Sequence, residues 1–174
     1  MMKQTALLVV DMQTGLIEGH PYNEQNVINN IKTLLLKCRE KQIEVIYVRH
    51  DDGVDSDLAY GSDAWEICKE IAPRANEKIF NKSYNSAFRG TGLREYLDNK
   101  KIDTLILVGM QTEYCIDATC KVAFEYGYHV IIPENTITTF DNALLSGKEL
   151  SEYYTNQIWN NRFAVVKPIE QIEL

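Results

Sequence analysis

The sequence lacks the features that define several large classes of protein. It has no uninterrupted apolar run that approaches the length of about 20 residues needed for a membrane-spanning helix. It also has no apolar leader followed by a small-residue cleavage site, as a signal peptide would. With 18 basic and 25 acidic residues, the net charge is −7 and no basic stripe is available for nucleic acid. We therefore expect a cytoplasmic protein that binds neither membranes nor nucleic acid.

Cysteine and histidine are also scarce. The four cysteines show no CxxC spacing, and their density is far below that of a disulfide-stapled domain. The three histidines lie far apart and form no HExxH pattern. His50 beside Asp51 and Asp52 suggests a metal site, but a solvated loop explains these residues better because no second histidine is near. We expect no metal and no other cofactor, and keep a metal-assisted hydrolase as an alternative.

The sequence does contain a regular alternation of apolar strands and amphipathic helices. Its 174 residues, 45% of them hydrophobic, are typical of one globular domain, which we assign to residues 1–174. Strands are predicted at residues 5–10, 43–48, 78–80, 104–108, 129–132 and 163–166. Helices are predicted at residues 24–41, 64–71, 93–99, from 115 onward and at 143–160, with loops at 12–22 and 134–141. The fold class is therefore α/β, a three-layer α-β-α arrangement with a mostly parallel, six-stranded Rossmann-like sheet.

The segment GMQTEYC, residues 109–115, joins a predicted buried strand to a predicted helix. Open α/β sheets bind their ligands at this end of the strands. Thr112 is the predicted N-cap, which places Cys115 in the first helical turn, where free amides and the helix dipole favour a thiolate. Glu113 and Asp117 oppose this effect because nearby anions raise the pKa of a thiol. The alternative interpretation of Cys115 is a structural cysteine in the core.

Two further charged residues follow predicted strands. Asp11 follows the first strand, and Lys82 follows the third. Taken alone, Asp11 is explained equally well as a turn aspartate, and Lys82 as a solvated lysine, which most lysines are. Because the carboxyl ends of parallel strands share one edge of a sheet, Asp11, Lys82 and Cys115 can converge there. They would supply a base, a cation and a nucleophile, and amides at the helix start could bind an oxyanion, which together suits acyl transfer.

Three motifs in this order resemble the isochorismatase-like cysteine hydrolase superfamily, which includes nicotinamidases, N-carbamoylsarcosine amidases and streptothricin hydrolases. The motifs are LLVVDMQ at residues 7–13, NKSYNSAFRGTGL at 81–93 and LVGMQTEYCIDATC at 107–120. The resemblance implies that Asp11, Lys82 and Cys115 are catalytic. It also implies a non-proline cis peptide between Met110 and Gln111, which directs the backbone amides of Gln111 and Cys115 at the oxyanion.

Departures from the superfamily pattern narrow the expected activity. Nicotinamidases carry an Asp-x-His metal site where this chain has the sequence RHDD at residues 49–52, so we expect neither nicotinamidase activity nor zinc or iron. Isochorismatases proper lack the cysteine at position 115, and Tyr114 before it resembles the streptothricin hydrolase branch. The predicted activity is hydrolysis of a non-peptide C–N bond, in a small amide or lactam, through a thioester intermediate.

Apolar and aromatic residues near the expected site are candidates for the substrate pocket, although core packing explains each of them equally well. These residues are Leu16, Trp65, Tyr84, Phe88 and Tyr114. The acidic net charge favours a neutral or cationic substrate over an anionic one.

Two further expectations concern an alternative function and the oligomeric state. A thiol redox or binding protein on the same scaffold is an alternative, but residues Cys115 and Cys120 lie on different faces of a helix, which disfavours a disulfide. The resemblance also implies a homo-oligomer, for which the C-terminal segment supplies apolar interface candidates. These candidates are Tyr153, Tyr154, Ile158 and Trp159.

Overall fold

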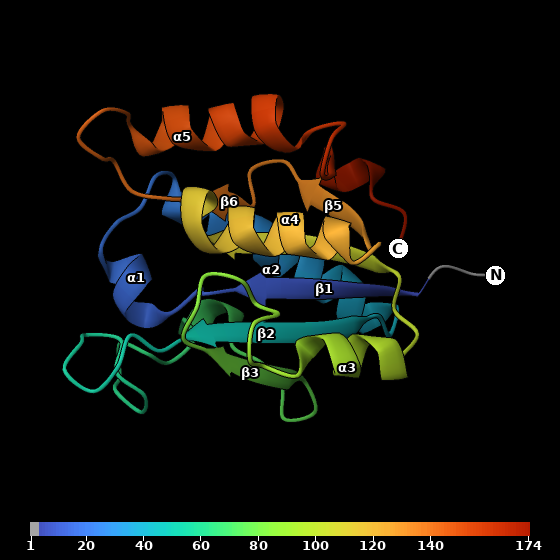
Figure 1. Ribbon diagram of the computed structural model, residues 1–174, viewed down its shortest axis with the longest axis horizontal. Coiled ribbons are helices and arrows are strands. Elements are labelled where there is room, and N and C mark those ends of the chain that lie inside the picture. The colour runs from blue at the N-terminus through green and yellow to red at the C-terminus, as the bar shows by residue number, and fades with distance from the viewer. Residues whose placement is uncertain (1–3) are drawn as a thin grey trace.

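The computed structural model describes residues 4–174 and has three layers, a parallel sheet between two layers of helices (Figure 1). Along the sheet the strand order is β3-β2-β1-β4-β5-β7, and the short strand β6 pairs with β4; every pairing is parallel. The strands are β1 (Thr5–Val10), β2 (Glu44–His50), β3 (Lys78–Lys82), β4 (Thr104–Met110), β5 (His129–Pro133), β6 (Ile137–Thr138) and β7 (Val165–Lys167). The predicted α/β architecture is confirmed, and β6 adds a seventh strand to the six expected.

Helices cover both faces of this sheet (Figure 1). Helix α2 (Glu24–Glu40) packs its apolar stripe on one face, and α3 (Leu93–Asn99) and α4 (Asp117–Glu125) pack on the other. The central strands β1 and β4 lie between the two apolar clusters, which explains why their sequences are apolar without alternation. None of the helices within residues 4–174 is long and apolar enough to cross a membrane.

Three predicted segments differ from the structure. The predicted loop at residues 12–22 contains α1 (Thr14–Glu18), and the predicted loop at 134–141 contains β6. The predicted helix at 64–71 is reduced to a 3-10 turn, Lys69–Ile71. Its first half instead forms backbone hydrogen bonds with residues 13–15, including Gly15 N to Ala64 O at 2.9 Å. These long-range hydrogen bonds override the local helical pattern, which the sequence alone cannot reveal.

The last predicted helix, residues 143–160, is shorter at its start and irregular at its end. Helix α5 (Gly147–Tyr153) begins after Ser146, whose hydroxyl accepts a hydrogen bond from the backbone of Glu149 in a capping box. Asp141, in the loop before this helix, accepts a hydrogen bond from Gly147 N. A π-helical segment, Tyr154–Trp159, continues the chain. The capping box therefore sets the start of α5, four residues later than predicted.

The close packing of β1 on β4 requires a glycine at the end of β4. Gly109 has φ +123°, and a Cβ atom at this position would lie 2.0 Å from the carbonyl oxygen of Val10. Any larger residue would separate the two strands at the edge where Asp11 begins the next loop. The peptide bond that follows, Met110 to Gln111, is cis, as the family resemblance implies.

Candidate active site

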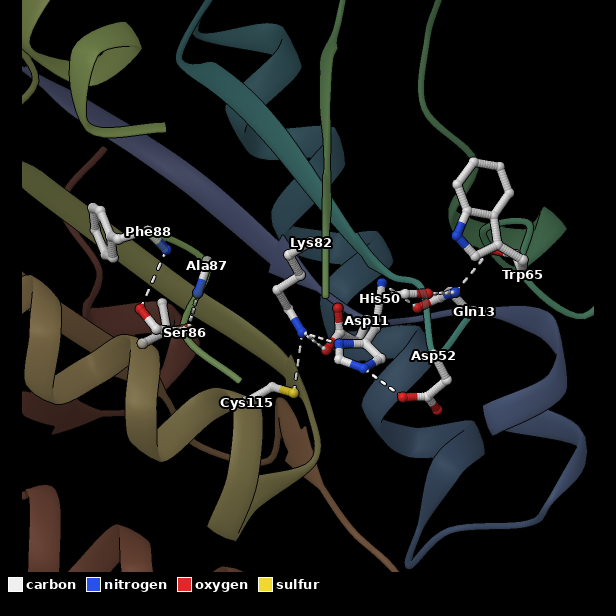
Figure 2. A network of polar contacts seen from close by, with 11 residues as sticks. Asp11, Gln13, His50, Asp52, Trp65, Lys82, Ser86, Ala87, Phe88 and Cys115 are labelled. Atoms are coloured by element: carbon white, nitrogen blue, oxygen red, sulfur yellow. Dashed lines mark hydrogen bonds and ion pairs between the residues drawn. The ribbon is translucent and has the colours of Figure 1, made fainter. Parts of the chain in front are cut away.

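The side chains of Asp11, Lys82 and Cys115 meet at the carboxyl edge of the sheet (Figure 2). Asp11 follows β1, Lys82 ends β3, and Cys115 lies after β4. The Nζ atom of Lys82 lies 2.7 Å from Asp11 Oδ2 and donates a hydrogen bond to Cys115 Sγ at 3.1 Å. All three residues are buried, with exposed fractions of 1%, 3% and 8% in chain order. The ammonium therefore joins the carboxylate and the thiol within the protein interior.

Cys115 was predicted to lie in the first turn of a capped α-helix, and the structure differs from this prediction. Residues Thr112–Ile116 form a π-helical turn, and α4 begins only at Asp117. Thr112 does not act as the N-cap, because its hydroxyl contacts the Ser151 hydroxyl of α5 at 3.2 Å. The anions Glu113 and Asp117 have their own partners, Thr139 for the first and Trp159 with Lys121 for the second.

Burial dominates the electrostatics of the site. Burial, together with the smaller effect of the neighbouring Asp11, raises the pKa of the Cys115 thiol to about 12 against the opposing effect of Lys82. Burial also raises the pKa of Asp11, against the opposing effect of Lys82. The sequence indicated that free amides at the helix start favour a thiolate, and the burial of Cys115 opposes this effect. Burial thus favours the protonated form of the Cys115 thiol and makes the Asp11 carboxylate a stronger base than an ordinary aspartate.

His50, which the sequence suggested as a loop residue, is a third partner of Lys82. It ends β2, and its Nδ1 lies 2.8 Å from Lys82 Nζ while its Nε2 lies 2.7 Å from Asp52 Oδ1 (Figure 2). Asp11, His50 and Cys115 offer ligand atoms within 4.8 Å of one another, a grouping that could hold a metal ion. However, the Lys82 ammonium contacts all three residues and itself supplies the positive charge. These residues therefore fit an ammonium better than a metal ion.

Gln13 is a polar residue of the site that the sequence interpretation did not single out. Its side-chain amide donates hydrogen bonds to the carbonyl oxygens of His50 and Trp65, at 2.9 and 3.0 Å, and its Oε1 accepts one from His50 N at 2.8 Å. Gln13 is completely buried. The signal was its place in the motif LLVVDMQ, two residues after Asp11, where a buried amide requires partners.

A cavity of about 160 Å³ opens beside the three converging side chains. Its walls are formed by Asp11, Leu16, His50, Asp52, Leu58, Asn85, Gln111, Tyr114 and Cys115. Two of the five predicted pocket residues, Leu16 and Tyr114, are among them. Leu58 and Asn85 were not predicted, because each lies in an irregular segment with no periodic pattern to place it.

The other three predicted pocket residues lie outside this cavity. Trp65 is buried, with the guanidinium of Arg49 lying 3.5 Å from its ring centroid. Phe88 packs in the core against the rings of Tyr126 and Tyr128. Tyr84 is half exposed and has the guanidinium of Arg89 over its ring. Core and surface packing therefore account for the aromatic character of these three positions.

Comparison with known proteins identifies the family. Residues 5–166 match the isochorismatase domain, which is most of the chain. The chain belongs to the isochorismatase family. The matched region contains the carboxyl edge of the sheet with Asp11, Lys82 and Cys115.

Several characterised proteins are similar to this isochorismatase-family chain. Streptothricin hydrolase of Streptomyces noursei is 29% identical over 138 residues, which cover 78% of this chain and 50% of that protein. The chain thus spans about half the length of this relative. Nicotinamidase 3 of Arabidopsis thaliana is 27% identical over 156 residues, covering 82% and 77%. The crystal structure of N-carbamoylsarcosine amidase from Thermoplasma acidophilum superposes with a TM-score of 0.81 at 25% identity, covering 98% and 99%.

The residues predicted for a subunit interface or for a redox role lie in the interior or at the C-terminal surface of this isochorismatase-family chain. Trp159 is completely buried, and its indole donates a hydrogen bond to Asp117, so it is unavailable for an interface between subunits. Tyr153 is half exposed. Cys120 is completely buried in the core cluster, and burial raises the pKa of its thiol to about 12. This environment disfavours a redox role for Cys120.

Proposed function

We propose that this isochorismatase-family hydrolase cleaves a C–N bond in a small amide or lactam by covalent cysteine catalysis. One observation carries the proposal: the Lys82 ammonium binds the Asp11 carboxylate at 2.7 Å and the Cys115 sulfur at 3.1 Å beside a cavity. A buried thiol with an adjacent base and cation is the arrangement that nucleophilic catalysis requires. The names of two similar proteins, N-carbamoylsarcosine amidase and nicotinamidase 3, also describe amide hydrolysis.

In the first half of the reaction, Cys115 attacks the substrate carbonyl while Asp11 accepts the thiol proton. The raised pKa of Asp11 makes it a stronger base than an ordinary aspartate, and the raised pKa of Cys115 favours the thiol as the form that it deprotonates. Lys82 stabilises the negative charge as it forms on sulfur, and the backbone amides of Gln111 and Cys115 hold the oxyanion. The tetrahedral intermediate then collapses, and the amine leaves with the proton returned by Asp11. The product of this half-reaction is a thioester on Cys115.

In the second half, water hydrolyses the thioester. Asp11 accepts a proton from the water as its oxygen attacks the thioester carbonyl, and the same two amides again hold the oxyanion. The C–S bond breaks, Cys115 recovers its proton from Asp11, and the carboxylic acid leaves. Asp11 therefore accepts one proton and gives it up again in each half-reaction, and Lys82 remains a cation throughout.

The cavity limits the substrate to a small group at the reacting carbonyl. Its volume is about 160 Å³, and its walls combine the apolar Leu16 and Leu58 with the polar Asn85 and Asp52. An anionic acyl group would be repelled by the carboxylates of Asp11 and Asp52 at this wall. A neutral or cationic amide is therefore the substrate class that the site favours.

A panel of small amides and lactams tests the proposal by release of the amine and by mass spectrometry of the Cys115 peptide. We expect turnover by the native protein, a transient mass increase on Cys115 equal to the acyl group, and loss of both in Cys115→Ala. The control Cys68→Ala removes another buried cysteine, which lies outside the cavity, and should remain active. Full activity of Cys115→Ala would exclude the covalent mechanism.

A further inference from the structure

We propose that His50 and Asp52 form a positioning pair that holds the Lys82 ammonium against Asp11 and Cys115. The inference rests on the proposed function, in which Lys82 stabilises the sulfur anion. Asp52 acts on His50, and His50 acts on Lys82, so neither residue has to touch the reacting atoms. The pair accounts for the polar contacts of Lys82 that the cysteine mechanism leaves unexplained.

The hydrogen-bond count of Lys82 supports the proposal. A lysine ammonium has three N–H donors. Lys82 Nζ has three acceptors within reach: Asp11 Oδ2 at 2.7 Å, His50 Nδ1 at 2.8 Å and Cys115 Sγ at 3.1 Å. The Lys82 side chain has no exposed surface, so solvent does not replace an acceptor that is removed. His50 therefore satisfies one third of the donor capacity of a buried cation.

The contact between Lys82 and His50 also defines how the imidazole is protonated. Lys82 can donate to Nδ1 only if that nitrogen carries no hydrogen, so the hydrogen of neutral His50 must lie on Nε2. Nε2 lies 2.7 Å from Asp52 Oδ1, which accepts this hydrogen. A carboxylate on one ring nitrogen makes the other nitrogen a better acceptor. Asp52 thus selects the one tautomer of His50 that can bind the Lys82 ammonium.

The backbone around His50 keeps the imidazole in place. His50 and Lys82 are register partners on the neighbouring parallel strands β2 and β3, so their side chains leave the sheet side by side. Gln13 binds both the N–H and the carbonyl oxygen of His50. The peptide after it is held as well, because Asp51 N donates to Lys82 O at 2.8 Å. Three independent contacts thus fix the position of His50 relative to Lys82.

The titratable groups that face His50 are Lys82, Asp11, Asp52 and the Cys115 thiol. Among these, Lys82 lowers the pKa of Cys115 and Asp11 raises it. If His50 is replaced by an apolar residue, one N–H of the ammonium loses its acceptor, and the ammonium is held less firmly against sulfur. The thiolate of Cys115 then becomes harder to form.

Alkylation of Cys115 by iodoacetamide, followed by peptide mass spectrometry between pH 7 and 10, measures this effect without a substrate. We expect His50→Leu to slow alkylation at fixed pH roughly tenfold, which corresponds to about one pKa unit. His50→Gln retains a side-chain oxygen that can accept from Lys82, and should restore most of the rate. The control His20→Gln changes an exposed histidine paired with Glu24 and should leave the rate unchanged.

A double-mutant cycle tests whether Asp52 acts through His50. Asp52→Ala should slow alkylation in the native background and have no further effect in the His50→Leu background. The matched control is Asp55→Ala, another exposed aspartate of the same loop, which has no expected effect in either background. Because Asp52 is 54% exposed, Asp52→Ala should fold, and it reports whether the pair affects Cys115 even if His50→Leu does not fold.

The outcomes separate this proposal from the proposed function. If Lys82→Ala slows alkylation and both His50→Leu and Asp52→Ala leave it unchanged, the positioning pair is refuted and the cysteine mechanism stands. If Asp52→Ala has the same effect in both backgrounds, Asp52 does not act through His50. Metal analysis provides the last test: one equivalent of zinc that disappears in His50→Leu would identify His50 as a ligand and overturn the proposal. If Lys82→Ala has no effect either, the proposed function loses its cation.

Discussion

Two ion pairs in this protein have similar contact distances, but the pKa values of their carboxylates are shifted in opposite directions. Arg39 and Glu77 form two hydrogen bonds of 2.8 Å in a partly buried position, and Lys82 and Asp11 form one contact of 2.7 Å in the interior. Burial alone would raise the pKa of Glu77, but hydrogen bonds from Arg39 and from the backbone of Arg74 outweigh it and lower that pKa. For Asp11 burial is the stronger influence, and the pKa is raised.

The comparison shows that two ion pairs of similar length can leave their carboxylates with opposite pKa shifts, according to the balance between burial and hydrogen bonds. Glu77 is a weak base that links α2 to the segment after the 3-10 turn, a structural role. Asp11 remains paired yet basic, which suits proton transfer. A carboxylate paired with a cation therefore stabilises the fold at one place and is suited to proton transfer at the other.

The largest expected difference concerns removal of the cation. Lys82→Met leaves the Asp11 charge buried without a partner, which should lower the free energy of unfolding by about 3–5 kcal/mol and abolish turnover. Arg39→Met should cost only about 1.5–3 kcal/mol, since Glu77 keeps its hydrogen bond to the Arg74 amide. Denaturant unfolding of both variants measures the difference. Equal losses would show that burial does not distinguish the two pairs.

The second expected difference concerns the carboxylates. Asp11→Asn cannot accept a proton, so kcat/KM for the amide substrate should fall by about 10²- to 10⁴-fold. Glu77→Gln should leave kcat/KM unchanged and affect only stability. Steady-state kinetics on correctly folded variants makes the comparison. An Asp11→Asn enzyme within tenfold of the native rate would assign the base to another residue.

The two carboxylates also predict different responses to acid. Asp11 must be ionised to act as a base, and its raised pKa means that activity is lost as the pH falls through a value above 3.8. The pKa of Glu77 is lowered from 4.5, so its stabilising effect is present above that value and is lost only as the pH falls through the lower, folded-state pKa. A pH range should therefore exist in which the protein is folded but inactive. Circular dichroism beside a pH–rate profile would reveal it, and simultaneous loss of both signals would contradict it.

The smallest expected effect is that of Arg39→Lys. A lysine preserves the charge but replaces two parallel hydrogen bonds by one point contact. We expect a loss of roughly 0.2–1 kcal/mol in the free energy of unfolding, and no change in kcat or KM. A thermal melt compared with that of the native protein measures the loss. Any change in kcat would connect this pair to the active site and weaken the contrast drawn above.

The parts of the fold that depend on local patterns were predictable from the sequence. Strand β1 and helix α3 have the predicted bounds, because their apolar residues follow the periodicity of one element. Helix α1 and strand β6 were missed since both depend on contacts with distant segments. Residues 64–67 were predicted to be helical and are not, for the same reason.

The site was predictable only in part. The rule that parallel strands end at one edge, with the family resemblance, anticipated the meeting of Asp11, Lys82 and Cys115. The contact of His50 with Lys82 could not be read from the sequence, because it depends on the register of β2 on β3. The pKa of Cys115 also could not be predicted from the sequence, because it depends on a degree of burial that only the packed structure defines.

The most direct test of the account is the pKa of the Cys115 thiol, measured by thiolate absorbance and by the pH dependence of alkylation, in the native protein and in Asp11→Asn. We predict a native thiol that remains protonated well above its ordinary value of 9.0, and a lower pKa in Asp11→Asn, because Asp11 raises the native value. The variant should thus be more readily alkylated and yet unable to turn over substrate. A native thiolate at neutral pH that is unchanged in Asp11→Asn would contradict the role of Asp11 as the base.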